Sequence, residues 1–407
     1  MLVNLVPLFD ENLAVNAYSL FTQKKNSFTN PSLLGTGSLD GASRVEGLEL
    51  VETVGVEALA DSKNLFIPVT NISIFMDLEN QNNVQHERVI LLFDNSITPE
   101  ELYIDRLRKL KASGYKLAMR KLEVAKFELY REVLLLMDYM FLDSQKIDIT
   151  KARIYFSKIY PNIRLCAGNI DSMERFEKLR TEGGYQFYEG FFYRTAINKG
   201  QHEVSPLKVN YIQLLNMVNS PDFELGEAAE VIGRDTALVI DLLKLVNHMT
   251  INGQITGIKH AAAMLGEKAL RKWLTTVVSA KLYMDKPNEV TRLSLLRAKM
   301  AENLAPMFAL AAQSSDLFLT GLFSVLDVIL EMPIADALQM VQVPKDVSDV
   351  LVEGKGKLAP VIDFLLQYER ANWQEVSRQM VIYNLDEKDI YDAYMNALKW
   401  YADLLEA

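Results

Sequence analysis

The sequence predicts an α/β barrel in the first half of the chain and an all-helical domain in the second half. Segments with the pattern of strands alternate with segments with the pattern of helices up to about residue 195. Beyond that point only helix patterns follow. A polar segment that contains Gly200 separates the two regions at residues 195–204. We therefore expect two domains, residues 1–198 and residues 199–407.

The first half opens with two apolar strands, residues 2–9 and 14–21, which are joined by a polar turn at residues 10–12. Further strand patterns fall at residues 65–69, 88–93, 115–122, 133–140, 164–167 and 185–192. Helix patterns fall at residues 45–60, 99–112, 150–159 and 172–181, and a loop rich in Gly and Ser at residues 26–43. This alternation favours a parallel sheet, and the number of strands fits a closed barrel better than an open doubly wound sheet. No Gly-rich phosphate loop follows a strand, so a dinucleotide-binding fold is not supported.

The stretch at residues 115–122 decides what the barrel can do. The helix before it is expected to start with Thr98 as N-cap and Pro99 as first helical residue, and to stop at Gly114. Apolar residues then alternate up to Arg120 and Lys121, which we expect at the C-terminal mouth of the barrel, where such barrels keep their chemistry. Two adjacent cations at that place would repel a metal ion rather than hold it.

Composition narrows the classes of function. The formal net charge of the 407-residue chain is -10, which argues against non-specific binding to nucleic acid or to an anionic membrane surface. The single cysteine, Cys166, lies in an apolar run and is expected to be a buried small hydrophobe in a reducing compartment. No cation precedes Lys24, so the first residues do not resemble a signal peptide, and no apolar run reaches the length of a membrane span. We expect a cytoplasmic protein.

The order of the segments in the first half resembles the EAL family of cyclic di-GMP phosphodiesterases, and especially its branch with a C-terminal HDOD domain. The segments are VPLFD, AYSLF, LFIPVT, RVILLFD, GYKLAMRKL, MDYMFLD, LCAGNIDSMERFE and GYQFYEGFF. In the second half, RDTALVIDLLKLVNH and GIKHAAAMLGEKALRKWL resemble HDOD domains, and DLFLTGLFSVLDVIL resembles the segment that follows HDOD in the same branch. The resemblance implies a TIM-like (β/α) barrel followed by an all-helical HDOD domain with a C-terminal helical extension.

The functional residues that the resemblance implies are replaced in this chain. The family's metal-binding Glu falls on Ser19, its metal-binding Asn on Pro68 and a further Glu on Leu91. Two ligand-contacting positions, a Gln and an Arg in the family, hold Val6 and Gln23. The family's paired Asp residues fall on Arg120 and Lys121, and its Lys falls on Phe141. Its later Glu pair falls on Gly168 and Asp171, and its last Gln falls on Glu189.

Hydrolysis of a phosphodiester on two divalent ions needs several convergent oxygen ligands. The predicted mouth instead offers mostly cationic and apolar side chains, so we expect no catalytic residue, no metal and no cofactor. Arg120 and Lys121 leave two alternatives open, an anion-binding site or internal ion pairs with Asp171 or Glu189, of which the ion pairs are favoured.

The helical half lacks the adjacent His-Asp pair of a metal-dependent HD phosphohydrolase, because none of its histidines, nor His86 in the first half, precedes an Asp. His248 and Asp241 lie seven residues apart on one helical face, but two ligands seldom fix a metal. The stripe that contains Trp273 has core spacing, which favours a core role over a partner groove.

We expect a non-catalytic signalling or scaffold protein that acts through a protein partner. The resemblance implies a link to cyclic di-GMP pathways, motility or surface attachment. The alternatives are a receptor that binds cyclic di-GMP without cleaving it and, as a third hypothesis, an active metal-dependent phosphodiesterase. The sequence leaves open the identity of the partner and whether the chain forms homo-oligomers.

Overall fold

The computed structural model describes residues 2–23, 45–60, 62–78, 86–194, 206–220, 222–233, 235–249, 255, 257–282, 288–341 and 343–406. The predicted Gly- and Ser-rich loop at 26–43 and the predicted linker at 195–204 lie outside these ranges. The chain forms two compact units, the first made of Met1–Thr195 with Leu366–Tyr391, the second of Ala196–Leu365 with Asp392–Ala407. The sequence analysis had placed residues 366–391 in the helical domain.

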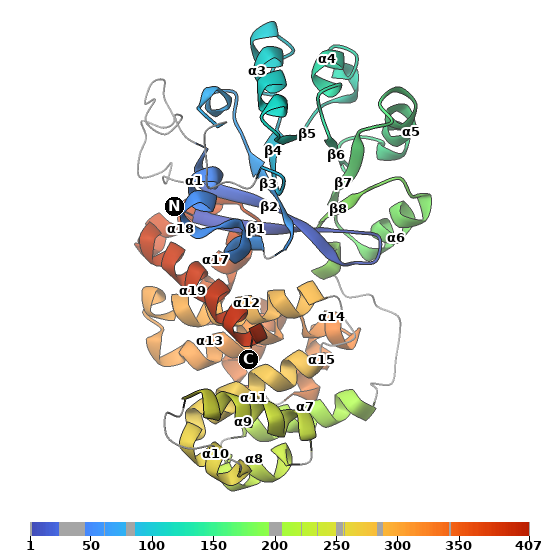
Figure 1. The fold of residues 1–407 in the computed structure, drawn as a ribbon. Helices are drawn as coiled ribbons and strands as arrows, with labels where there is room; N and C mark the ends of the chain where they lie inside the picture. Colours follow the sequence, from blue (N-terminus) through green and yellow to red (C-terminus); the bar gives the residue numbers. More distant parts are fainter. Residues whose placement is uncertain are drawn as a thin grey trace. The chain divides into compact units, whose positions relative to one another are not determined.

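The first unit is built on a closed eight-stranded barrel in the order β1 to β8 (Figure 1). Its strands are β1 Leu2–Phe9, β2 Val15–Gln23, β3 Asn64–Pro68, β4 Val89–Phe93, β5 Lys116–Met119, β6 Tyr139–Asp143, β7 Arg164–Ile170 and β8 Phe187–Gly190. The predicted barrel is therefore confirmed, but the sheet is mixed: β1 is antiparallel to both β2 and β8, and β2 to β8 are parallel. The carboxylate of Asp10 closes the first hairpin by accepting the backbone N–H groups of Asn12 and Ala14, at 2.8 and 2.9 Å.

Helices lie between β2 and β3 and between consecutive strands from β4 to β8 (Figure 1). They are α1 Glu46–Val54, α2 Val56–Ala60, α3 Glu101–Ala112, α4 Arg131–Leu134, α5 Ile149–Ile159 and α6 Met173–Glu182. The predicted strand at residues 133–140 was wrong over residues 133–138, where the chain forms the end of α4 and a turn. The predicted cap of α3 was also wrong, because Glu100 holds the N-cap position and makes no side-chain cap bond.

The interior of the barrel is filled by one apolar cluster to which every strand contributes. It contains Leu8, Ala17, Phe66, Ile90, Leu92, Ala118, Tyr139, Phe141, Cys166 and Phe187. Side chains alternate between the two faces of a strand, so this cluster identifies the residues that point inward. Cys166 is buried within it, as predicted.

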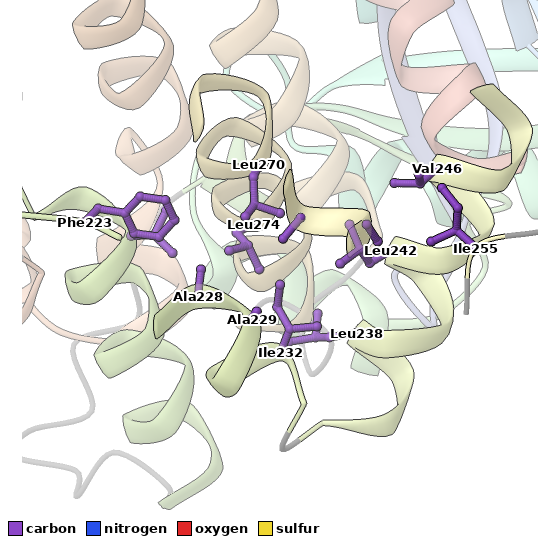
Figure 2. Packing of buried hydrophobic residues seen from close by; sticks show 13 residues of the cluster. Phe223, Ala228, Ala229, Ile232, Leu238, Leu242, Val246, Ile255, Leu270 and Leu274 are labelled. Carbon is purple, nitrogen blue, oxygen red and sulfur yellow. The ribbon is translucent and has the colours of Figure 1, made fainter. Parts of the chain in front are cut away.

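Among the residues described, the second unit contains helices and their connecting turns and no strand. Its helices are α7 Pro206–Asn219, α8 Leu225–Ile232, α9 Thr236–Met249, α10 Ile258–Leu265, α11 Glu267–Leu282, α12 Asn288–Leu304, α13 Ser314–Phe323, α14 Leu326–Leu330, α15 Ile334–Met340, α16 Lys345–Glu353, the first part of α17 Ala359–Glu369 and most of α19 Glu387–Glu406. Figure 2 shows part of its core, in which Ile232 of α8, Leu238 and Leu242 of α9, and Leu270 and Leu274 of α11 converge. No helix in the described part of the chain has the length and apolar character needed to cross a membrane.

The remaining residues of the first unit come from the C-terminal end of the chain. The last turn of α17, the helix α18 Trp373–Tyr383 and the start of α19 pack with the barrel. We call residues 366–391 the C-terminal strap. The strap matters for the site because its polar contacts fall on the rim of the barrel.

Candidate functional site

The candidate site is the mouth of the barrel, where the C-terminal ends of β2 to β8 meet. Of the predicted site residues, Ser19, Phe141, Gly168 and Glu189 each lie two positions beyond an inward-facing residue of their own strand. Arg120 follows the last residue of β5 and keeps the inward direction of Ala118. Pro68, at the end of β3, has the same direction as Phe66.

Leu91 does not share this direction. Its neighbours Ile90 and Leu92 belong to the interior cluster with Phe66, so the side chain of Leu91 points to the outer face of β4. Leu92 is therefore the inward residue at this level. Reading the sequence alone could not settle the register, because the whole strand Val89–Phe93 is apolar and buried.

Arg120 occupies the centre of the mouth. Its backbone N–H donates to the Phe93 carbonyl at 2.9 Å, which continues the pairing of β5 with β4. Its guanidinium lies over the rings of Phe21 and Phe141, at 5.4 and 5.9 Å from their centroids, and Nη2 is 3.5 Å from Oε1 of Glu189. Nε and Nη1 are buried and have no hydrogen-bond partner among the described residues. The centre of the mouth thus holds a fixed cation.

Within the described part of the barrel, Glu189 is the one acidic side chain buried at this centre, with 6% of its surface exposed. Its second oxygen, Oε2, is 3.5 Å from the hydroxyl of Ser19, which donates to it. A Cβ atom added at Gly168 would lie 4.0 Å from Oε1 of Glu189, so the two positions are close neighbours. The sequence suggested Glu189 or Asp171 as the partner of Arg120, and in the structure Arg120 pairs with Glu189. Asp171 lies at an exposed position after β7.

The ion pair of Lys121 is different from the predicted one. Lys121 has a left-handed backbone conformation, with φ of 58°, and its Nζ lies 3.6 Å from the carboxylate of Asp94. Burial opposes ionisation of Asp94, but hydrogen bonds from Ser96 and the charge of Lys121 hold its pKa below the ordinary value. The two adjacent cations therefore face different carboxylates on different strands.

Below the ion pair, the thiol of Cys166 is sealed in the barrel interior. Burial raises the pKa of Cys166 well above its ordinary value, and the negative charge of Glu189 adds to the effect. A neutral, inaccessible thiol cannot serve as a nucleophile.

The C-terminal strap covers one sector of the mouth, at the ends of β8, β1 and β2. Gln23, the last residue of β2 and the position of the family's ligand-contacting Arg, donates to the hydroxyl of Ser377 at 2.9 Å. The side chain of Asn4 donates to the backbone carbonyl of Glu369 at 2.7 Å, and the carboxylate of Glu369 pairs with Arg194 at 2.9 Å. Sequence analysis missed this sector, since nothing local in residues 366–391 points to the barrel.

Among the described residues, no group of three or more His, Cys, Asp or Glu side chains is arranged to hold a metal ion. The proposed two-ligand pair at Asp241 and His248 stays untested, because the side chain of His248 is not among those described. His202 also lies outside the described residues, and His260 is exposed on α10.

Comparisons with known proteins agree with this architecture. Residues 204–342 match the HDOD domain family. The uncharacterized protein YuxH of Bacillus subtilis is 26% identical over 412 residues, which cover 98% of both chains. Cyclic di-GMP phosphodiesterase CdgJ of Vibrio cholerae is 29% identical over 243 residues, which cover 59% of this chain and only 56% of CdgJ. Among solved structures, the EAL-like domain protein YdiV shares 15% identity and aligns with 46% of this chain and 89% of its own, with a TM-score of 0.37.

The mixed barrel, with its antiparallel first strand, precedes the segment that matches the HDOD family. The chain is therefore a mixed eight-stranded barrel followed by a helical region whose residues 204–342 match the HDOD domain family, and it is similar in sequence to a cyclic di-GMP phosphodiesterase over 59% of its length.

Proposed function

We propose that this protein is a non-catalytic signalling component that acts by contact with other proteins in a pathway related to cyclic di-GMP. The observation that carries the proposal is the Arg120–Glu189 pair at the centre of the mouth. At the level where a phosphodiesterase of this fold would gather carboxylates around metal ions, this chain holds a guanidinium and the one buried carboxylate that balances it.

The electrostatics support the proposal. Two unit charges about 4 Å apart interact by about 4 kcal/mol at an effective dielectric constant of 20, so a divalent ion beside the Arg120 guanidinium would lose roughly twice that energy. Glu189 could offset this loss only by releasing Arg120, which would leave the guanidinium buried without its counter-charge.

The contacts of the C-terminal strap are a second observation that supports the same proposal. Gln23, Asn4 and Arg194 hold the strap at the rim, so a ligand that entered this sector would meet the chain's own residues. By analogy with the resemblance, the regulated process is motility or surface attachment, and the output is binding rather than turnover.

The direct test is hydrolysis by the full-length protein of cyclic di-GMP and of a generic phosphodiester, bis(p-nitrophenyl) phosphate, with Mg²⁺ or Mn²⁺. We expect no turnover above the rate of the buffer. Turnover that disappears in Glu189→Gln would overturn the proposal, because a contaminating enzyme would be insensitive to that substitution.

A second candidate is a receptor that binds cyclic di-GMP without cleaving it, and the unpartnered Nε and Nη1 of Arg120 favour it. Thermal unfolding with cyclic di-GMP separates the two candidates, because a ligand at about 100 times its Kd stabilises the folded state by about 2.7 kcal/mol. A rise in Tm that is lost in Arg120→Met would establish the receptor. An unchanged Tm at millimolar ligand would leave the protein-contact role.

A further inference from the structure

The helical unit contains an open groove of about 630 Å³, all of whose lining residues belong to this unit. Its floor is one face of α11, and its walls come from α9, α10, α12 and α19. The wall residues are Asp241, Leu245, Leu265, Thr291, Leu295, Trp400, Tyr401 and Asp403. The lining is mainly apolar and aromatic, with charged groups among it.

The floor is one face of α11, part of which is exposed to the groove and part of which, including Trp273 and Val277, also packs against the core of the unit. Seven residues of α11 line the groove at the spacing i, i+3, i+4, i+7, i+8, i+11 and i+12: Ala269, Lys272, Trp273, Thr276, Val277, Ala280 and Lys281. This spacing is one continuous stripe along a helix and spans about 18 Å at about 1.5 Å per residue. The neighbouring stripe, with Leu270 and Leu274, is buried in the core of the unit (Figure 2).

Small side chains along the stripe would let another helix approach closely. Ala269 and Ala280 lie near its two ends, and between them the partly buried ring of Trp273 lines the groove while it also packs against the core. Ridges of one helix pack into grooves of this kind on another, and Trp is a residue type that dominates helix-in-groove contacts.

The charged residues of the groove indicate which side chains should flank the apolar stripe of such a helix. Lys272 is already neutralised, because its Nζ contacts both carboxylate oxygens of Glu302 at 2.7 and 2.6 Å. Asp241, Asp403 and Lys281 have no ion-pair or hydrogen-bond partner within the described ranges. Two open carboxylates against one open ammonium, on a chain with a net charge of -10, favour a basic ligand.

We propose that this groove binds one amphipathic α-helix of a protein partner, with an apolar stripe that packs along α11 and basic side chains that face Asp241 and Asp403. The proposal rests on the proposed protein-contact function and names the kind of partner that it requires. Trp273 and Val277 pack against the core of the unit, as the sequence analysis favoured for this stripe, and in this proposal they also line the groove.

The experiment measures the binding of labelled synthetic helices to the full-length protein by fluorescence polarisation. Because the stripe spans about 12 residues, probes of about 15 residues are long enough. The first probe carries a leucine stripe flanked by lysines, the second replaces every lysine by glutamate, and the third places a proline at the centre of the first.

Two groove variants are tested, Ala280→Trp, which fills the groove, and the pair Asp241→Asn with Asp403→Asn. Their matched controls are Ala263→Trp and Glu230→Gln, at exposed positions outside the groove.

We expect the basic helix to bind saturably and at least about tenfold more tightly than the acidic or the proline-broken probe. Ala280→Trp should weaken it by about tenfold or more, and the double asparagine variant should bring the basic and acidic probes to within about threefold of each other. Equal affinity of Ala280→Trp and Ala263→Trp would overturn the proposal. Self-association of the unliganded protein that Ala280→Trp abolishes would also overturn it, because a second copy would then be the occupant. Failure here leaves the hydrolysis assay of the proposed function unaffected, so the two failures are distinguishable.

Discussion

The hydroxyl of Tyr368 satisfies both backbone groups of Val3, 365 positions away in the sequence: it accepts the Val3 N–H at 3.1 Å and donates to the Val3 carbonyl at 2.7 Å. Strand β1 pairs with β8 only at Leu8 and Phe9, so the edge of β1 near Val3 extends past the end of β8. A buried strand edge needs partners for its N–H and C=O groups. One tyrosine of the C-terminal strap supplies both partners and so completes the barrel.

Replacing Tyr368 with Phe should destabilise the barrel unit. The substitution removes both hydrogen bonds and leaves two buried polar groups of Val3 unpaired, which costs about 1–3 kcal/mol. Urea unfolding followed by circular dichroism measures the loss. Tyr103→Phe is the matched control, because Tyr103 contributes only a ring contact to Phe75 within the described residues. Equal stability of the two variants would show that the strap does not complete the edge of β1.

The Arg120–Glu189 pair predicts a non-additive double mutant. Glu189→Gln keeps the size of the side chain but removes the counter-charge of a guanidinium that is 19% exposed, and should cost about 2 kcal/mol. Adding Arg120→Met removes the unpaired charge, so the double variant should be no less stable than Glu189→Gln alone. Unfolding free energies that add across the two substitutions would show that the pair is not coupled.

Cys166 should make the stability fall at alkaline pH. Its folded-state pKa is raised by burial, so in the unfolded chain the thiol ionises above about pH 8.5 while in the folded protein it stays protonated. The free energy of unfolding should therefore decline by up to about 1.4 kcal/mol per pH unit above that pH. The matched variant Cys166→Ala should lack this component, whatever its stability at pH 7. Parallel pH profiles of the two proteins between pH 8 and 10 would contradict the assignment.

Local sequence patterns were sufficient to predict most strands of the barrel. They were insufficient where the same residues fit both the helical period and the strand period. The first strand was predicted at residues 2–9 and observed at Leu2–Phe9, because an alternating apolar run ends at the hairpin of Asp10. Residues 133–140 contain an unbroken leucine run, which suits a helix and a strand equally. The register of β6 decided the outcome: it starts at Tyr139, opposite Arg164 of β7.

The site could be predicted in part for the same reason. The position of Arg120 after β5 followed from strand order, and Glu189 was one of the two carboxylates suggested as its partner. The Lys121–Asp94 pair depends on the left-handed backbone conformation of Lys121, which changes the direction of its side chain. No local sequence pattern predicts this conformation. The contacts of the strap with β1 and β2, such as Gln23 with Ser377, join parts of the chain more than 350 positions apart and have no local signal in the sequence.

Glu302 provides a pH-dependent test of the network beneath the groove. Burial alone would raise its pKa, but the hydrogen bonds and charges of Lys272 and Lys299 outweigh burial and hold the pKa below 4.5. A carboxylate with a depressed folded-state pKa stabilises the protein above its unfolded pKa, and this contribution disappears as the pH falls through the folded value. Glu302→Gln should therefore cost about 1–2 kcal/mol at pH 7, where the three side chains are 20–36% exposed, and progressively less below about pH 4.

The matched control is Glu353→Gln, whose pair with Lys355 is more than half exposed at 3.8 Å and should contribute nothing measurable. Because Glu302→Gln also leaves the Lys272 ammonium in the groove without its counter-charge, the variant should bind the basic helical probe more weakly and the acidic probe more tightly than the wild type. Urea unfolding between pH 3 and 7 checks the first expectation and fluorescence polarisation the second. A stability difference that stays constant over this pH range would mean that Glu302 is not held ionised by the two lysines. Unchanged probe affinities would mean that the floor of the groove does not sense the charge of Lys272.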